Sequence, residues 1–148
     1  MAPPTIADAV GILLKNEAPA VFRLATETLF KVVQNILADP ENDAMRRLKR
    51  STNTFSTKIA PAKGAVRFLR AVGFEEEGAG EEASLVLRAP DLKLLEEGKL
   101  ALKASVKEYS RLQEEARRIE NEAAAEKLRM LREVSKSNLR DAEAGARA

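Results

Sequence analysis

The stretch that most constrains the fold runs from Met45 to Phe74, where charged, capping and apolar segments follow one another. It opens with a cation cluster between Arg46 and Arg50, continues through polar residues favoured at helix N-termini, and closes with apolar residues at helical spacing. Gly73 ends this pattern, because glycine takes the left-handed conformation after a helix without a Cβ clash. The order therefore predicts an extended segment, a capped turn and a short helix.

The cation cluster is short and lies between turn signals, which favours an extended segment over Arg46–Ser51. A helix is expected to begin near Asn53 and to run through Phe55 to Ile59, and a second helix to start at Pro61. The apolar stripe of this second helix consists of Val66, Leu69 and Val72.

Two helices are expected before this stretch. Thr5 is a good N-cap for a helix to about Lys15, and Pro19 suits the first turn of a longer helix that ends at Asp39 and Pro40. The apolar residues of the longer helix recur every three or four positions: Phe22, Ala25, Leu29, Val32, Val33 and Ile36.

After the stretch, an extended piece at Phe74–Glu76, a Gly-rich acidic turn and a strand at Ser84–Arg88 are expected. Asp91 opens a long helix, of which one stripe would pack onto the domain: Leu95, Leu102, Val106 and Tyr109. Beyond Leu112 the pattern weakens, so the last third is expected to be a solvated helix or linker with a disordered end, 141–148.

Composition excludes several kinds of chemistry. The 148 residues contain no Cys and no His, so a disulfide framework, a thiolate nucleophile and a Cys/His zinc site are excluded. The acidic stretch Glu75–Glu82 lacks the alternation of a calcium loop, and no cofactor or metal is expected. No apolar run approaches the about 18 residues of a membrane span, and the N-terminus does not look like a signal peptide. We expect a protein of the cytoplasm, with the nucleus as a further location.

The cation cluster has three open interpretations. The chain carries 25 cations against 23 anions, so the local clusters matter more than the total. The cluster could be a solvated basic face, a surface for an acidic peptide, or a surface for nucleic acid. Nucleic acid is the least favoured, because stacking aromatics and a base-reading motif are missing.

The ordered segments NTFSTKIAPAKGAV and VGFEEEG, preceded by Asn35-Ile-Leu and Pro40, resemble the PUB (PUG) domain known from peptide:N-glycanase and from UBX- and UBA-containing proteins. The resemblance covers roughly Phe22 to Pro90. It implies an α+β fold in which a helical bundle packs on a small antiparallel β-sheet. The chain would then comprise an N-terminal helix (1–16), a PUB-like domain (17–112) and a charged helical extension (113–148).

The resemblance also implies a function. PUB domains are adaptors, not enzymes, and they bind the C-terminal tail of the valosin-containing AAA ATPase, a short acidic segment with an aromatic residue near its end. This would link the chain to the ubiquitin pathway and to ER-associated degradation. The implied peptide-binding residues are Asn35, Met45, Lys49, Arg50, Thr52, Asn53 and Phe55.

Three of these positions depart from the family pattern. Met45 stands where an aromatic residue is common, Lys49 where an Arg is typical, and Thr52 where a second Asn is expected. A Lys cannot reproduce the bidentate contact of an Arg, so the ligand or its affinity is expected to differ. The alternative function is a helical scaffold that self-associates through its C-terminal helix, whereas the adaptor interpretation predicts a monomer.

Overall fold

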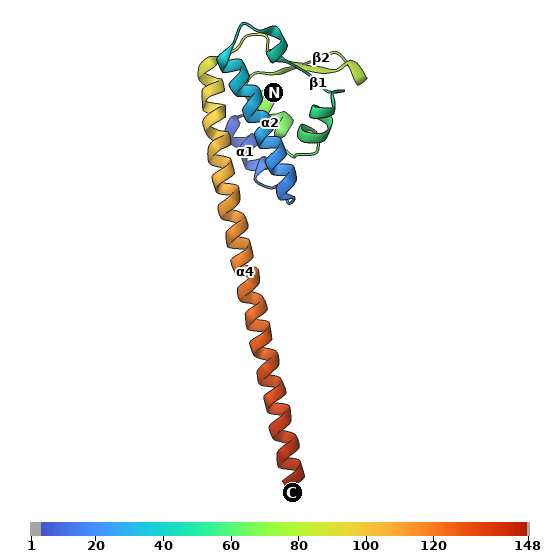
Figure 1. Cartoon of the computed structure of the whole chain (residues 1–148), viewed down its shortest axis with the longest axis vertical. Helices are drawn as coiled ribbons and strands as arrows, with labels where there is room; N and C mark the ends of the chain where they lie inside the picture. Colours follow the sequence, from blue (N-terminus) through green and yellow to red (C-terminus); the bar gives the residue numbers. More distant parts are fainter. Residues whose placement is uncertain (1–3, 148) are drawn as a thin grey trace. The chain divides into compact units, whose positions relative to one another are not determined.

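The computed structural model describes residues 4–147 (Figure 1). They form two compact units, of which the first ends at Tyr109 and the second begins at Ser110. The last helix, α4 (Leu92–Arg147), contributes residues to both units. The first unit is α+β, with helices and one small antiparallel sheet, as the resemblance implies.

The first two helices form where their caps and apolar periodicity predict. The Thr5 hydroxyl accepts a hydrogen bond from the amide of Asp8 at 3.1 Å and so caps α1 (Ile6–Leu13). Pro19 occupies the first turn of α2 (Pro19–Ala38), where its missing N–H has no partner to lose. The core face of α2 consists of Phe22, Ala25, Thr26, Leu29, Val33 and Ile36.

The sheet has the order β1-β3-β2, so the central strand comes last in the sequence. β3 (Ser84–Val86) pairs antiparallel with β1 (Arg47–Lys49), and Leu48 lies opposite Leu85. β3 also pairs antiparallel with β2 (Glu75–Glu77). β1 and β3 are shorter than expected, and β2 keeps the expected length but begins one residue later. A 3-10 turn, η1 (Asp43–Arg46), takes up the start of the first predicted strand.

The helix expected near Asn53 is present, and its continuation η2 (Phe55–Ile59) has the wider π geometry. The helix expected at Pro61 begins later, as α3 (Ala65–Ala71). Gly64 precedes it with a left-handed φ of 87°, which a right-handed helix cannot include, so this boundary was predicted wrongly.

Gly73 ends α3 as predicted, with a φ of 114°. Its amide bonds to the carbonyl of Arg70 at 3.1 Å, and the next amide, of Phe74, bonds to the carbonyl of Leu69 at 3.0 Å. These two bonds form a Schellman motif, which satisfies carbonyls at the helix end and turns the chain into β2.

The first turns of α4 pack on the domain. Asp91 caps the helix, accepting a hydrogen bond from the amide of Leu94 at 3.1 Å. Leu95, Leu102 and Tyr109 are buried as predicted, but Val106 is 46% exposed, so the expected stripe is incomplete.

Tyr109 fixes the end of the first unit. Its ring stacks on Phe22 with centroids 3.8 Å apart, and its hydroxyl donates a hydrogen bond to the carbonyl of Asn16 at 2.8 Å. Burial raises the pKa of Tyr109 above its ordinary value. The Asn16 side chain in turn donates to the carbonyls of Leu13 and Lys63 and accepts from the Lys63 amide. α1, the loop before α3 and α4 are therefore held together at one point.

In the second unit the described side chains of α4 are mostly solvent-exposed. Ion pairs run along its surface, among them Arg111 with Glu115 at 3.1 Å and Arg129 with Glu126. The end predicted as disordered, 141–148, is described only as backbone, which is helical as far as Arg147. Ala148 lies outside the described residues.

Candidate functional site

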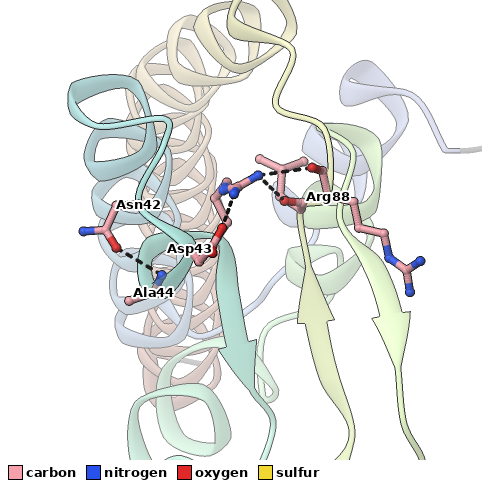
Figure 2. Close-up of polar contacts among 6 residues, drawn as sticks. Asn42, Asp43, Ala44 and Arg88 are labelled. Carbon is pink, nitrogen blue, oxygen red and sulfur yellow. Dashed lines mark hydrogen bonds and ion pairs between the residues drawn. The ribbon is translucent and has the colours of Figure 1, made fainter.

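Arg46 fixes the position of η1, the turn that precedes β1. Asn42 caps η1 by accepting a hydrogen bond from the amide of Ala44 at 3.1 Å, and Asp43 pairs with the guanidinium of Arg46 (Figure 2). The same guanidinium donates to the carbonyls of Leu87 and Arg88, at 3.3 and 3.1 Å. Arg46 thus ties η1 to the end of β3, so one cation of the predicted cluster has a structural role.

Four other arginines of the first unit pair with the acidic strand β2. Arg50 lies 3.2 Å and Arg70 3.1 Å from the two carboxylate oxygens of Glu76. Arg47 approaches Glu77 at 3.9 Å, and Arg88 approaches Glu75 and Glu77 at 3.6 and 3.7 Å. We call this set the arginine–glutamate cluster: Arg47, Arg50, Arg70, Arg88, Glu75, Glu76 and Glu77. Its acids neutralise Arg47 and Arg50, two cations of the cluster for which the sequence leaves a solvated face, a peptide surface and a nucleic-acid surface open.

Lys49 differs from its arginine neighbours. It is exposed on β1, an edge strand of the sheet, and forms no ion pair with any residue in the described part of the chain. Met45, 39% exposed, lies on η1, and Asn35 is exposed in the last turns of α2. α2 contacts both η1 and η2, and η1 contacts β1, so the elements that carry these predicted residues are neighbours in the domain.

Thr52 lies in the bend after β1, and Asn53 begins the helical turn that leads into η2. The Thr52 hydroxyl donates to the carbonyl of Lys49 at 2.9 Å and accepts from the amide of Phe55 at 3.3 Å. The carbonyl of Asn53 accepts hydrogen bonds from the hydroxyls of Ser56 and Thr57, at 3.2 and 2.6 Å. The Thr52 hydroxyl is therefore engaged in capping, as its sequence position predicts, while Asn53 is exposed.

Phe55 and Arg50 form a pair that is largely internal. Phe55 is only 4% exposed and belongs to the hydrophobic core, so its ring supports the edge from beneath. The Arg50 guanidinium lies 5.7 Å from the centroid of that ring and is one-third exposed. Of this pair, Arg50 is the residue that a ligand could reach.

Sequence reasoning missed the pairing of β2 with the arginines, because it treated the acidic stretch as a solvated turn. The signal was present: an extended piece at Phe74–Glu76 beside a strand from Ser84 places glutamates across a sheet from the cations. Sequence reasoning also missed a lysine-rimmed groove on α2, to which residues from three separate elements contribute.

The described residues offer neither a metal site nor a membrane-spanning helix. Within the described residues, no group of three or more acidic side chains is placed to hold a metal ion. Nor does any helix in that part of the chain have the length and apolar character needed to cross a membrane.

The comparisons with known proteins agree with the fold. The chain matches the family model of the PUB domain over residues 20–100. It is 38% identical over 73 residues to UBX domain-containing protein 6 of Caenorhabditis elegans, which is 49% of this chain and 17% of that protein. It is 37% identical over 68 residues to the peptide-N(4)-(N-acetyl-beta-glucosaminyl)asparagine amidases of Rattus norvegicus and Homo sapiens, 46% of this chain and 10% of each of those proteins.

The shared segment is thus a small part of each relative, and in the amidases it is the PUB region. PUB domains are protein-interaction modules. From its helices, its three-stranded sheet and the extent of this match, the chain belongs to the PUB domain family.

Proposed function

We propose that this chain is a non-enzymatic adaptor that binds the C-terminal tail of the valosin-containing AAA ATPase. The observation that carries the proposal is the unpaired cation of Lys49 on an exposed edge strand, beside elements that present Met45, Asn35 and Asn53. An acidic, aromatic-ended peptide is the ligand that this combination suits best.

Each exposed group matches one feature of such a peptide. The Lys49 ammonium takes a carboxylate, and the Met45 thioether can pack against an aromatic ring. The amides of Asn35 and Asn53 can hydrogen-bond an extended peptide backbone, and the edge of β1 offers main-chain donors and acceptors. Because β2 already neutralises the neighbouring arginines, the affinity should be modest, in the low-micromolar to sub-millimolar range.

A titration with a synthetic copy of the ATPase tail tests this proposal. Lys49→Glu should weaken binding about fivefold or more, because it replaces the attracting charge by a repelling one. Lys127→Glu, the same change on the second unit, should leave the affinity within about twofold. Amide shifts that move around Lys49 and Asn53 would place the ligand, and the absence of any titration at millimolar peptide would exclude this function.

The cellular role follows from the partner. An adaptor of this kind would recruit a larger protein to the ATPase in ubiquitin-linked or ER-associated degradation. This role would place it in the cytoplasm, with the nucleus as a further location. Pull-down of the ATPase from cells by the wild-type chain but not by Lys49→Glu would support this role.

A second candidate function is self-association through α4. The second unit exposes large apolar side chains, each more than a third accessible: Leu112, Ile119, Leu128, Met130, Leu131, Val134 and Leu139. A helix that buries these residues against a second copy would act as a scaffold. Sedimentation over a range of concentrations distinguishes the two, since a concentration-independent monomer excludes self-association.

A further inference from the structure

A groove of about 840 Å³ lies along α2 within the first unit, and two of its lining residues, Gln34 and Thr54, are chain neighbours of predicted tail-binding residues. Its lining comes from α2, from the turn at η2 and from the part of α4 between Leu102 and Lys107. None of the seven residues assigned to the tail peptide is among its lining residues. The groove therefore differs in its lining from the predicted tail-binding surface at the β1 edge.

The apolar part of the groove is accessible to solvent. Leu24 is 38% exposed and Val106 is 46% exposed, while the ring of Phe30 is half-buried. Val106 is the residue that the α4 stripe predicts to be packed on the domain, and it faces this groove instead. These side chains give a ligand an apolar surface that no segment in the described part of the chain covers.

The charge around the groove is strongly one-sided. Lys31, Lys58, Lys103 and Lys107 line it, against the single acid Glu27. None of the four lysines forms an ion pair with the residues that the structure describes. This absence contrasts with the arginine–glutamate cluster, where the cations already have carboxylate partners.

Lys103 links the basic rim of the groove to its apolar surface. The Lys103 ammonium lies 5.7 Å from the centroid of the Phe30 ring, and that of Lys99 lies 5.8 Å from it. Such a contact is weak at an exposed site, roughly 0.5–1 kcal/mol. Lysines held this way can turn toward a carboxylate at little cost and uncover the ring for an apolar side chain.

We propose that this groove binds an acidic peptide segment that carries one or two large apolar side chains. The carboxylates would pair with the four lysines, and the apolar side chains would displace water from Leu24, Val106 and Phe30. A peptide is favoured over nucleic acid because the lining holds a single aromatic side chain, the half-buried Phe30, whereas surfaces that bind single strands stack successive bases on several aromatic rings. The site goes beyond tail binding, since it needs neither Lys49 nor Asn35.

The test uses a synthetic peptide of glutamates and serines with two leucines one helical turn apart, titrated into the full chain. Lys103→Glu combined with Lys107→Glu should weaken binding about tenfold, because two attracting charges become repelling ones. The matched control, Lys127→Glu combined with Lys136→Glu, places the same changes on the exposed second unit and should stay within about twofold of wild type. Equal affinities for the two double variants, with unchanged circular dichroism, would overturn the proposal.

Further measurements test which class of ligand binds and whether it binds in the groove. Leu24→Ser should weaken binding several-fold, and so should replacing the leucines of the peptide by serine. If neither change weakens binding, the groove recognises only the charges of the peptide, and the apolar part of the proposal is wrong. A single-stranded oligonucleotide that binds more tightly than the peptide, with a steeper salt dependence, would overturn the peptide assignment. So would a weakening by Lys49→Glu as large as that by the groove variant, because the probe would then occupy the β1 edge.

Discussion

Two basic regions of the first unit use their cations in opposite ways. In the arginine–glutamate cluster each arginine lies within 4 Å of a glutamate on β2, with distances from 3.1 to 3.9 Å. Along the α2 groove, four lysines surround an apolar surface and have no carboxylate partner among the described residues. One region uses its charges within the fold, and the other leaves them available to a ligand.

The difference teaches how to interpret a basic cluster. Arg has a planar fork that suits fixed carboxylate partners, whereas the ammonium of Lys sits on a flexible stem and stays well hydrated. Cations that the fold has already paired gain little from a further acid, since a new partner must displace the old one. Unpaired cations next to exposed apolar atoms are thus the better guide to a binding surface.

The largest difference between the regions should appear when their apolar residues are truncated. Phe55→Ala removes a core side chain that is 4% exposed and should cost about 3–5 kcal/mol of unfolding free energy. Leu24→Ala removes a groove side chain that is 38% exposed and should cost less than about 1 kcal/mol. Urea denaturation followed by circular dichroism measures both.

The milder change Phe55→Leu serves as the control, because it keeps most of the buried volume. If Phe55 acts only from beneath the edge, this variant should bind the tail peptide nearly as well as wild type. A strong loss of binding by a stable Phe55→Leu variant would instead show that the ring itself contacts the ligand.

A smaller effect should follow from charge reversal in the two regions. Glu76→Lys removes the carboxylate shared by Arg50 and Arg70 and adds a third cation beside them, which should cost about 1–2 kcal/mol. Lys103→Glu breaks no ion pair and loses only the exposed contact with the Phe30 ring, so it should cost no more than about 0.5–1 kcal/mol. Thermal unfolding of the two variants at low and high salt compares them.

Salt provides the internal control for this pair. Because the partners of Glu76 are partly exposed, added salt should reduce the loss of stability that Glu76→Lys causes. The stability of Lys103→Glu relative to wild type should not change with salt. Equal destabilisation by the two changes at low salt would contradict the distinction between paired and unpaired cations.

The sequence was sufficient for the elements with strong local signals. The Thr5 cap, Pro19 in the first turn, the Gly73 stop and the Asp91 cap all appear where predicted, because each depends on backbone geometry within a few residues. The start of α3 was missed, since Gly64 lies close against α1, where a Cβ would come 2.8 Å from the Ala9 carbonyl oxygen, and its neighbours in sequence do not indicate this contact.

The candidate site was less predictable, because its character depends on pairs of residues far apart in the chain. Arg50 is 26 positions from Glu76, and Lys58 and Lys103 line one groove from separate elements. A single sequence shows neither pairing nor its absence. The family resemblance could supply positions such as Asn35 and Lys49, but it could not show which cations the fold had neutralised.

A smaller change in stability than that of Glu76→Lys is expected from a variant in α4, the helix that forms one wall of the groove. Tyr109→Phe keeps the stack on Phe22 but removes the hydrogen bond to the Asn16 carbonyl, which should cost about 0.5–1.5 kcal/mol. Since this bond joins two neutral, buried groups, salt should not alter the loss, in contrast to that of Glu76→Lys. If Tyr109→Phe weakens binding of the groove peptide but leaves binding of the tail peptide unchanged, Tyr109 positions the part of α4 that lines the groove.

The stability that Tyr109 contributes also depends on pH. Burial raises the pKa of folded Tyr109. The folded chain therefore keeps the phenolic proton at pH values where the unfolded chain has lost it. The stability that Tyr109 contributes is then fully present below pH about 10 and is lost as the pH rises through the folded pKa. Tyr109 is the single tyrosine and there is no Trp, so ultraviolet absorbance follows this one titration. A midpoint at or below the ordinary value in the folded chain would mean that α4 does not bury the ring, and the groove would then lose its fixed wall.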